Sequence, residues 1–383
     1  MKKHFLNQSN TPDLQRLGKN NLKRFTIIFL FSLLASCKPT VSFDFVKEVV
    51  FTRENGTNDY FYCQCSDSLF IGNPYHSKTI YIHDLSSGKI LNQLKIPVDQ
   101  DIRCFHYDSD SSIYFFPFYS TKLLRYNKVR NKMDTIIDLS INTLSTLKRN
   151  GIDFGQSVEF IAGPASPLII KPPHYYISNT INPQDDRNGQ IPLLHFIVNK
   201  DSMITDNSIG RFPDNYYEDE KTIFPFNIAI TYTINSRDQI VVSHLADHNL
   251  YIYDLDGTET IKRCKSKHIK KLPDRIAVSE MDNEHLIQKR NSMKTYLGII
   301  FDPYRNCYYR FVRLSDAEKG HDMLNSFSIM ILDNGFNIIG EQMFKNTPYI
   351  CIGAHVIPDG LMLKKTDDFS GNTKYGLFKI KEK

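Results

Sequence analysis

The sequence predicts an all-β fold, a six-bladed β-propeller closed by an N-terminal strand, and three observations support this. Short strand-like runs recur along most of the chain, with four runs in a typical copy. The last copy has only three runs, whereas one additional run, residues 41–52, precedes the first copy. Tyr and Phe are abundant, at 21 and 26, and Trp is absent, a bias that favours strands.

The first element is a targeting segment. Basic residues precede an apolar run, residues 25–35, which is too short to span a bilayer but suits the hydrophobic region of a signal peptide. The run leads into Leu-Ala-Ser-Cys37, a lipobox whose cysteine thiol would carry a diacylglyceryl anchor. We therefore expect residues 1–36 to be a lipoprotein signal peptide and residues 37–383 to be a single propeller domain. An ordinary secretory signal, or a buried helix with a chance cysteine, is the alternative.

The targeting segment also carries the excess positive charge. The chain has 47 Lys and Arg against 42 Asp and Glu, and residues 1–36 contain six of the basic residues and one of the acidic ones. The remainder is balanced, so the composition gives no indication of nucleic-acid binding. No later segment approaches 18 consecutive apolar residues. We expect a cell-envelope protein held to a bacterial membrane, the outer membrane, by its lipid anchor, with the leaflet undetermined.

The elements after this segment follow in order. Residues 41–52 are expected to supply the outer strand of the last blade, because a three-stranded last blade would leave an edge unprotected. The runs alternate with a period of two, which excludes a helical solenoid and leaves a β-sandwich or a seven-bladed ring as alternatives. The six copies are residues 60–96, 102–139, 156–209, 226–264, 296–344 and 349 onward.

A longer connection, residues 265–295, separates the fourth and fifth copies. Its apolar residues recur at roughly helical spacing, which predicts a short amphipathic helical insertion. Such a helix would serve as a lid over the central depression or as a cover for exposed strand ends. The apolar residues concerned are Ile276, Ala277, Val278, Met281, Leu286 and Ile287.

Two segments carry a family resemblance. Residues 296–311 (YLGIIFDPYRNCYYRF) and, more weakly, residues 210–213 (GRFP) are similar to an uncharacterised family of Bacteroidetes lipoproteins with a TolB-like six-bladed β-propeller. The resemblance extends over nearly all of the chain after the signal peptide. Because its motifs are structural, it implies fold and location and carries over no catalytic residue.

The long connections indicate a binding face. In a four-stranded blade, the second-to-third connections and the links between blades open on one face, where this chain has its insertions. We expect this long-loop face to bind a glycan, a peptide or an envelope protein partner, although such loops are also tolerated as simple surface insertions. Arg310 either contacts the ligand or braces the loop. The candidate ligand-binding residues are Tyr216, Tyr217, His244, Asp247, His248, Arg310 and Arg313.

Catalysis is the alternative function. A metal-assisted hydrolase or lyase would place oxygen ligands near the start of the inner strands, at the axial mouth, where Asp59, Asp101, Glu159 and Asn227 lie in sequence. His244, Asp247 and His248 are metal-competent, but without a third ligand at fixed spacing we interpret them as a polar rim. No phosphate loop, nucleophile elbow or paired CxxC occurs. We therefore assign no metal and no cofactor.

The cysteines leave one point open. Six follow Cys37, and four of these fall on the predicted inner strands of neighbouring blades. An envelope location permits a disulfide such as Cys65 with Cys104, but buried free thiols suit crowded inner strands equally well.

Overall fold

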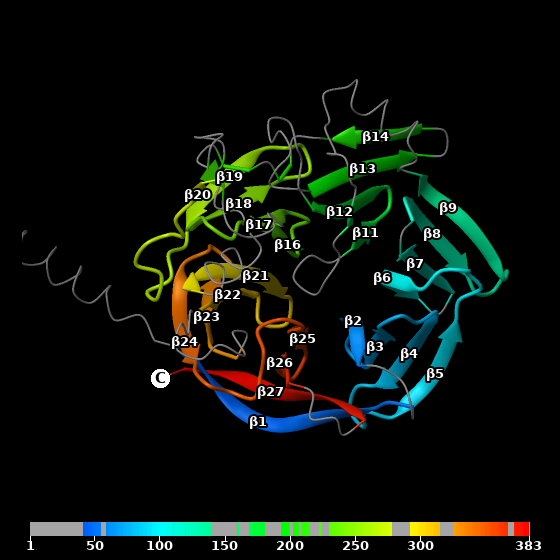
Figure 1. Cartoon of the computed structure of the whole chain (residues 1–383), viewed down its shortest axis with the longest axis horizontal. Helices are drawn as coiled ribbons and strands as arrows, with labels where there is room; N and C mark the ends of the chain where they lie inside the picture. Colours follow the sequence, from blue (N-terminus) through cyan, green and yellow to red (C-terminus); the bar gives the residue numbers. More distant parts are fainter. Residues whose placement is uncertain are drawn as a thin grey trace, which may run out of the picture. The chain divides into compact units, whose positions relative to one another are not determined.

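Six antiparallel sheets form the blades of a propeller around a central axis (Figure 1). The predicted all-β, six-bladed fold is confirmed. The computed structural model describes residues 41–54, 59–109, 111–118, 120–138, 159–160, 168–180, 193–199, 202–206, 209–210, 212–213, 216, 222–223, 230–277, 292–314, 325–366 and 371–382.

In the first three blades the chain forms an inner strand and then moves outward through the sheet. The first and second blades are regular four-stranded meanders, whereas the third adds the short strand β10, which pairs with β12. The strands are β2 Tyr60–Cys65, β3 Leu69–Pro74, β4 Thr79–Asp84, β5 Ile90–Lys95, β6 Ile102–Ser109, β7 Ser112–Pro117, β8 Lys122–Asn127, β9 Lys132–Asp138, β10 Glu159–Phe160, β11 Ile169–Lys171, β12 His174–Thr180, β13 Leu193–Asn199 and β14 Ser202–Asp206.

The last three blades repeat this order, and the sixth takes its outer strand from the N-terminus. The strands are β16 Thr231–Ile234, β17 Ile240–Ser243, β18 Asn249–Tyr253, β19 Glu259–Arg263, β21 Thr295–Asp302, β22 Cys307–Arg313, β23 Phe327–Asp333, β24 Ile338–Phe344, β25 His355–Ile357, β26 Gly360–Lys364, β27 Asn372–Glu382 and β1 Val41–Thr52.

The ring closes as the strand count predicted. Strand β1 pairs antiparallel with β27 from Val41 opposite Glu382 to Thr52 opposite Asn372, with a bulge between Phe45 and Lys47. The sixth blade therefore has the order β1-β27-β26-β25. Because β1 covers the free edge of β27, a main-chain ladder joins the two ends of the domain.

The middle strands are buried on both faces, because each blade packs between two others. Every residue of β17 and β22 is buried, whereas the outermost strand β19 is exposed along its whole length. Buried apolar clusters connect each blade with the next around the ring. One example is the ring of Phe51 on β1, stacked at 3.8 Å between centroids on Phe70 of the first blade.

Two features differ from the predictions. In the described part of the connection between the fourth and fifth blades, no helical element is found: Ile276–Ala277, where the helix was expected to begin, form a short strand, β20, paired with β15 Thr222–Ile223. Residues 278–291 lie outside the described residues. In the third blade, the run around Pro172 and Pro173 was expected to be one strand, but the chain turns there and gives both β11 and β12. Proline lacks the N–H that a continuous ladder requires, which explains the break.

Candidate functional site

A cavity of about 370 Å³ lies between the inner strands around the propeller axis. Every blade contributes to its wall, since β2, β6, β11, β16, β21 and β25 all have residues on it. The wall is mostly aliphatic and aromatic, with a few polar side chains. The lining residues that the structure describes are Tyr62, Cys63, Gln64, Cys65, His106, Leu168, Ile169, Ile170, Lys171, Tyr232, Thr233, Ile234, Ile299, Ile300, Phe301, Pro303, Tyr304, Ala354, His355 and Val356.

The cavity lies toward the ends of the inner strands at which the short first-to-second connections begin. In β16 and β21 it is lined by the later residues, and Pro303 and Tyr304 come from the connection after β21. Tyr304 is 41% exposed, and its hydroxyl donates a hydrogen bond to the carboxylate of Asp67 in the first blade. This contact joins the first-to-second connections of the fifth and first blades at the edge of the cavity.

Polar contacts between blades fix the same end of the axis. The Gln64 side-chain amide donates to the Tyr107 carbonyl at 3.1 Å and accepts from its N–H at 2.8 Å, which joins the first two blades. Lys171 forms an ion pair with Asp238, and the Arg305 guanidinium donates to the Ile357 carbonyl at 2.8 Å. These contacts hold the inner strands at fixed spacing, so the cavity is pre-formed.

Burial keeps several ionisable groups on the wall uncharged. Desolvation raises the pKa of the Cys63 thiol to about 12 and raises that of Cys65 well above its usual range. It also raises the pKa of the Tyr62 hydroxyl and lowers that of the His106 imidazole. At neutral pH these side chains present polar but neutral surfaces to the cavity.

His355 is the polar group on this wall that most needs a partner. The residue is 9% exposed, and its Nε2 is buried without a hydrogen-bond partner. Burial, together with the positive charge of Lys364, lowers the pKa of His355 to about 4. A neutral imidazole with an unsatisfied nitrogen costs about 1–3 kcal/mol, which a bound donor or acceptor would offset.

The sequence-predicted residue Arg310 lies elsewhere, fully buried between the fourth and fifth blades. Its guanidinium donates to the Ser243 hydroxyl at 3.0 Å and to the carbonyls of Asp247, His248, Asn249 and Cys264 at 2.7 to 3.3 Å. The Tyr296 ring lies 3.5 Å below it in a cation–π contact. In this arrangement Arg310 braces the turn between β17 and β18.

The neighbouring candidates join the same buried region. Asp247 accepts from the Tyr251 hydroxyl at 2.7 Å, and His248 Nδ1 lies 2.7 Å from the Tyr296 hydroxyl. The Tyr216 hydroxyl accepts from the Ala246 N–H at 2.9 Å. The structure therefore brings Arg310, Asp247, His248 and Tyr216 together within the protein rather than on its surface.

Two further candidate residues lie within the described part of the chain, and Tyr217 does not. His244 and Arg313 are also buried, at 1% and 6% exposure, and Arg313 donates to the Met293 carbonyl at 3.3 Å. Tyr217, Cys37 and much of the predicted long-loop face lie outside the described residues. The ligand-binding role assigned to these residues stays a prediction.

The carboxylates considered for catalysis do not converge on the cavity. Asp59 forms a 2.6 Å ion pair with Lys364 and accepts a 2.6 Å hydrogen bond from the Thr373 hydroxyl. The carboxylate of Asp101 lies 3.4 Å from the His76 ring. The Asn227 residue and the Glu159 side chain lie outside the described residues. Within the described part of the chain, no group of three His, Cys, Asp or Glu side chains could hold a metal ion.

The cysteines described by the structure are free thiols. Cys63, Cys104, Cys264, Cys307 and Cys351 are buried, and Cys65, on the cavity wall, is half-buried. Of the two alternatives for these residues, the structure has the buried free thiols.

Sequence reasoning did not identify the cavity residues. The available signal was polar residues such as Gln64, His106 and Thr233 within otherwise apolar inner strands. Which of them face the axis depends on register and bulges, such as the shift between Tyr60 and Tyr62, that the sequence does not show.

Comparison with known proteins supports the fold. A protein from Bacteroides vulgatus ATCC 8482, a member of the DUF4221 family, superposes with a TM-score of 0.72 at 16% identity, covering 90% of this chain and 100% of that one. A protein from Bacteroides fragilis NCTC 9343 named "putative exported protein" superposes with a TM-score of 0.53 at 9% identity, covering 91% and 96%. No curated protein matches the sequence.

Membership of a family is shown by the sequence itself. Residues 31–343 match the family described as "Domain of unknown function (DUF4221)", which is most of the chain. Among the described residues, no helix combines the length and apolar character needed to cross a bilayer. The chain belongs to the DUF4221 family, and its fold is a six-bladed β-propeller closed by its N-terminal strand.

Proposed function

We propose that this protein is a cell-envelope lipoprotein, anchored through Cys37 to a bacterial membrane, whose propeller binds a partner through the axial cavity. The observation that carries the binding proposal is the cavity itself, about 370 Å³ in volume and walled by all six blades. Its size and mostly apolar wall are typical of ligand sites. The lipobox supports the anchor, and the name "putative exported protein" of the Bacteroides fragilis neighbour is consistent with an envelope location.

The wall favours an apolar side chain of a peptide or protein over a glycan. A sugar presents hydroxyls all round and requires many hydrogen bonds, whereas Ile234, Ile299 and Ile300 offer none. A bulky apolar side chain would bury its surface against these residues. His355 and Thr233 would then orient the polar backbone beside it.

A hydrolase or lyase has weaker support. Asp59 and Asp101, the described carboxylates nearest the expected metal position, are engaged by Lys364 and His76. The pKa of Tyr62 is raised and those of His106 and His355 are lowered, so all three lie away from neutral pH, where a general acid or base is most effective. The binding module is therefore the better-supported function.

The test is a selection of peptides from a display library on the immobilised protein. We expect selected peptides to share a bulky apolar residue. They should lose at least about tenfold in affinity for an Ile300→Trp variant, in which the larger ring fills part of the cavity. Ile338→Trp, the same substitution on the outer strand of the same blade at a 40% exposed position, is the matched control and should leave binding unchanged.

Two outcomes would contradict the proposal. Selected peptides that bind the Ile300→Trp variant as well as the parent protein would exclude the cavity. Peptides that are insensitive to Ile300→Trp but weakened by Tyr217→Ala would instead support the long-loop face as the binding site.

A further inference from the structure

The most basic part of the described chain is the stretch that leaves the fourth blade. Residues 259–275 contain seven Lys and Arg against Glu259 and Asp274, although residues 37–383 as a whole carry balanced charge. The exposed members, with one more from the start of the next blade, are called the basic rim. It comprises Lys262, Arg263, Lys265, Lys267, Lys270, Lys271 and Lys294.

Buried residues hold this stretch in place and turn its cations outward. Cys264, Ser266 and Ile269 are fully buried, and the lysines between them are exposed. The Lys267 ammonium donates to the Glu341 carbonyl at 3.0 Å, and that of Lys294 lies 3.4 Å from the His268 carbonyl. Carbonyls are neutral acceptors, so these two contacts fix the direction of the side chains without cancelling their charge.

Among the residues that the structure describes, carboxylates neutralise only a small part of the rim. Glu341 accepts from the Ser266 hydroxyl at 2.5 Å and from the Lys267 N–H at 2.9 Å, and Lys271 pairs with Asp274 at 2.8 Å. Four rim lysines, Lys267, Lys270, Lys271 and Lys294, line a surface groove of about 570 Å³. The positive charge is therefore concentrated and open to solvent.

The start of the folded domain lies beside the same strand. Gly340 on β24 packs so closely against β1 that a Cβ there would come within 2.4 Å of the Val41 carbonyl oxygen. The next residue, Glu341, contacts Ser266 and Lys267. Figure 1 shows the start of β1 beside β24, on the same part of the rim as the chain that follows β19.

The distance to the lipid is short. Cys37 precedes Val41 by four residues, and four residues span at most about 14 Å even when fully extended. A lipid on Cys37 therefore keeps this part of the rim close to the headgroups. Electrostatic attraction acts over about 8–10 Å at physiological ionic strength, a comparable distance.

We propose that the basic rim contacts the anionic phosphate headgroups of the bilayer to which the protein is tethered, and so orients the propeller on the membrane. This inference rests on the lipoprotein anchor proposed above. A lysine near an anionic surface contributes about fivefold to membrane partitioning. The lipid anchor alone holds the protein to the membrane at one point. The basic rim adds a second, broader contact with the membrane, which restricts rotation of the propeller about the anchor.

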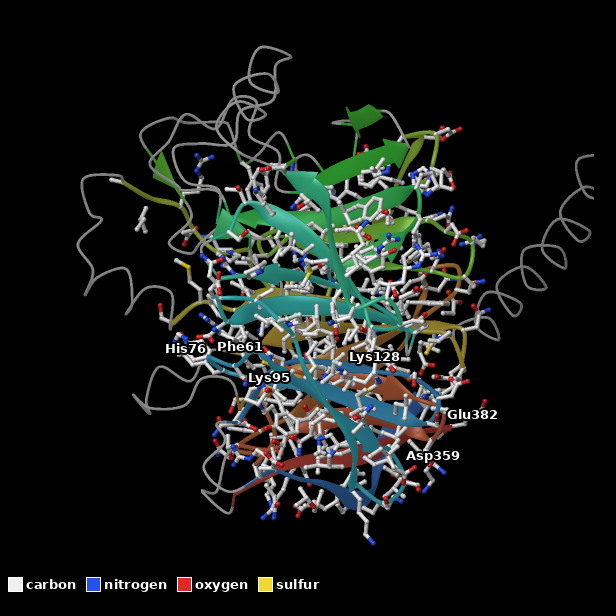
Figure 2. All side chains as sticks on the ribbon, turned by 90° about the vertical axis from the view of Figure 1, so that its right-hand side faces the viewer. Phe61, His76, Lys95, Lys128, Asp359 and Glu382 are labelled. Carbon is white, nitrogen blue, oxygen red and sulfur yellow. The ribbon has the colours of Figure 1, made fainter. Side chains whose placement is uncertain are left out.

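The experiment uses the lipidated full protein, reconstituted in vesicles of phosphatidylcholine alone or with one quarter phosphatidylglycerol. Lysine acetylation by a water-soluble reagent is read by mass spectrometry. Lys267, Lys270, Lys271 and Lys294 should be at least about threefold less reactive on the anionic vesicles, and 0.5 M salt should restore their reactivity. Lys95 and Lys128, on the side of the ring that faces the viewer in Figure 2, should react equally on both.

A pair of fourfold variants separates the rim from the anchor. Changing Lys267, Lys270, Lys271 and Lys294 to Gln should abolish the difference between vesicles in the acetylation of the two remaining rim lysines, Lys262 and Lys265. The same change at exposed Lys89, Lys95, Lys128 and Lys132 should preserve it. Equal acetylation of the parent protein on both vesicles would overturn the inference. A protein that fails to float with phosphatidylcholine vesicles lacks the anchor, and its binding to phosphatidylglycerol vesicles then decides the role of the rim alone.

Discussion

At the scale of single residues, Arg310 shows what a sequence can and cannot reveal. The sequence already singles out Arg310 as a charged residue within the apolar strand β22. It allows two roles for this side chain, a contact with the ligand or a brace for the neighbouring loop. The structure surrounds it with carbonyls from the turn between β17 and β18 and with the Tyr296 ring. The carbonyls lie more than forty positions away in the sequence, at spacings that no local pattern encodes.

Replacing Arg310 with Lys should destabilise the domain. A lysine has three donors on one atom and cannot satisfy acceptors spread around a planar fork, so several buried carbonyls would lose their partners. We expect a loss of about 3 kcal/mol in the free energy of unfolding, measured by urea denaturation. Arg130→Lys, at an exposed position, should change it by less than about 0.5 kcal/mol. A stable Arg310→Lys protein would contradict the bracing role.

His355 should make stability depend on pH. Its pKa is lowered from 6.5 to about 4 by burial and by Lys364, so the unfolded chain binds a proton that the folded protein excludes. The stabilisation is fully present above pH 6.5 and is lost as the pH falls toward 4. His248, with a pKa lowered to about 4 by burial and nearby cations, acts in the same direction. Urea titrations at pH 7 and pH 4.5 should show a smaller loss of stability for His355→Gln than for the parent protein.

At the scale of elements, ring closure was predictable and the connections were not. Counting three runs in the last copy and one unassigned run at the start is sufficient to pair β1 with β27, because an unpaired edge is unfavourable. The helix expected after β19 does not begin at Ile276 and Ala277, because these residues pair with β15 instead. Spacing alone cannot distinguish a short helix from a short strand stabilised by a distant partner.

Strand β1 offers a matched pair of substitutions. Phe51 is fully buried and stacks on Phe70, whereas Phe45 on the same strand is 54% exposed. Phe51→Ala should cost about 3–5 kcal/mol and lower the melting temperature of the whole domain, because it opens the junction between the last and first blades. Phe45→Ala should cost less than about 1 kcal/mol. Equal effects, or a domain that melts normally without residues 41–52, would contradict ring closure by β1.

At the scale of the whole molecule, the repeat specified the architecture but not the site. Six copies, each made of short runs whose residues alternate with a period of two, predict six blades. Each of these sheets must bury both of its faces against its neighbours. The axial cavity depends instead on how far the six inner strands stand from the axis, a result of bulges and of contacts such as Gln64 with Tyr107. Neither is visible as a motif, so the sequence directed attention to the loops.

Cys37→Ala should release the protein from membranes. Without the thiol no diacylglyceryl group can be attached, and that group supplies most of the membrane affinity at about 0.8 kcal/mol for each buried methylene. Fractionation at high salt, where the basic rim is screened, should find the parent protein in the membrane pellet and the variant in the supernatant. A variant that stays in the pellet under these conditions would refute the lipoprotein assignment.

The ladder between β1 and β27 also sets the order of events during synthesis. Val41 is among the first residues of the domain to leave the ribosome, and its partner Glu382 is almost the last. Such a non-local pairing makes folding slow, and the exposed edge of β1 must be kept from other strands in the meantime. If the protein is exported with its N-terminus first, as the proposed signal peptide implies, a lipid on Cys37 would be in place before Glu382 arrives, and the ring would then close at the membrane surface.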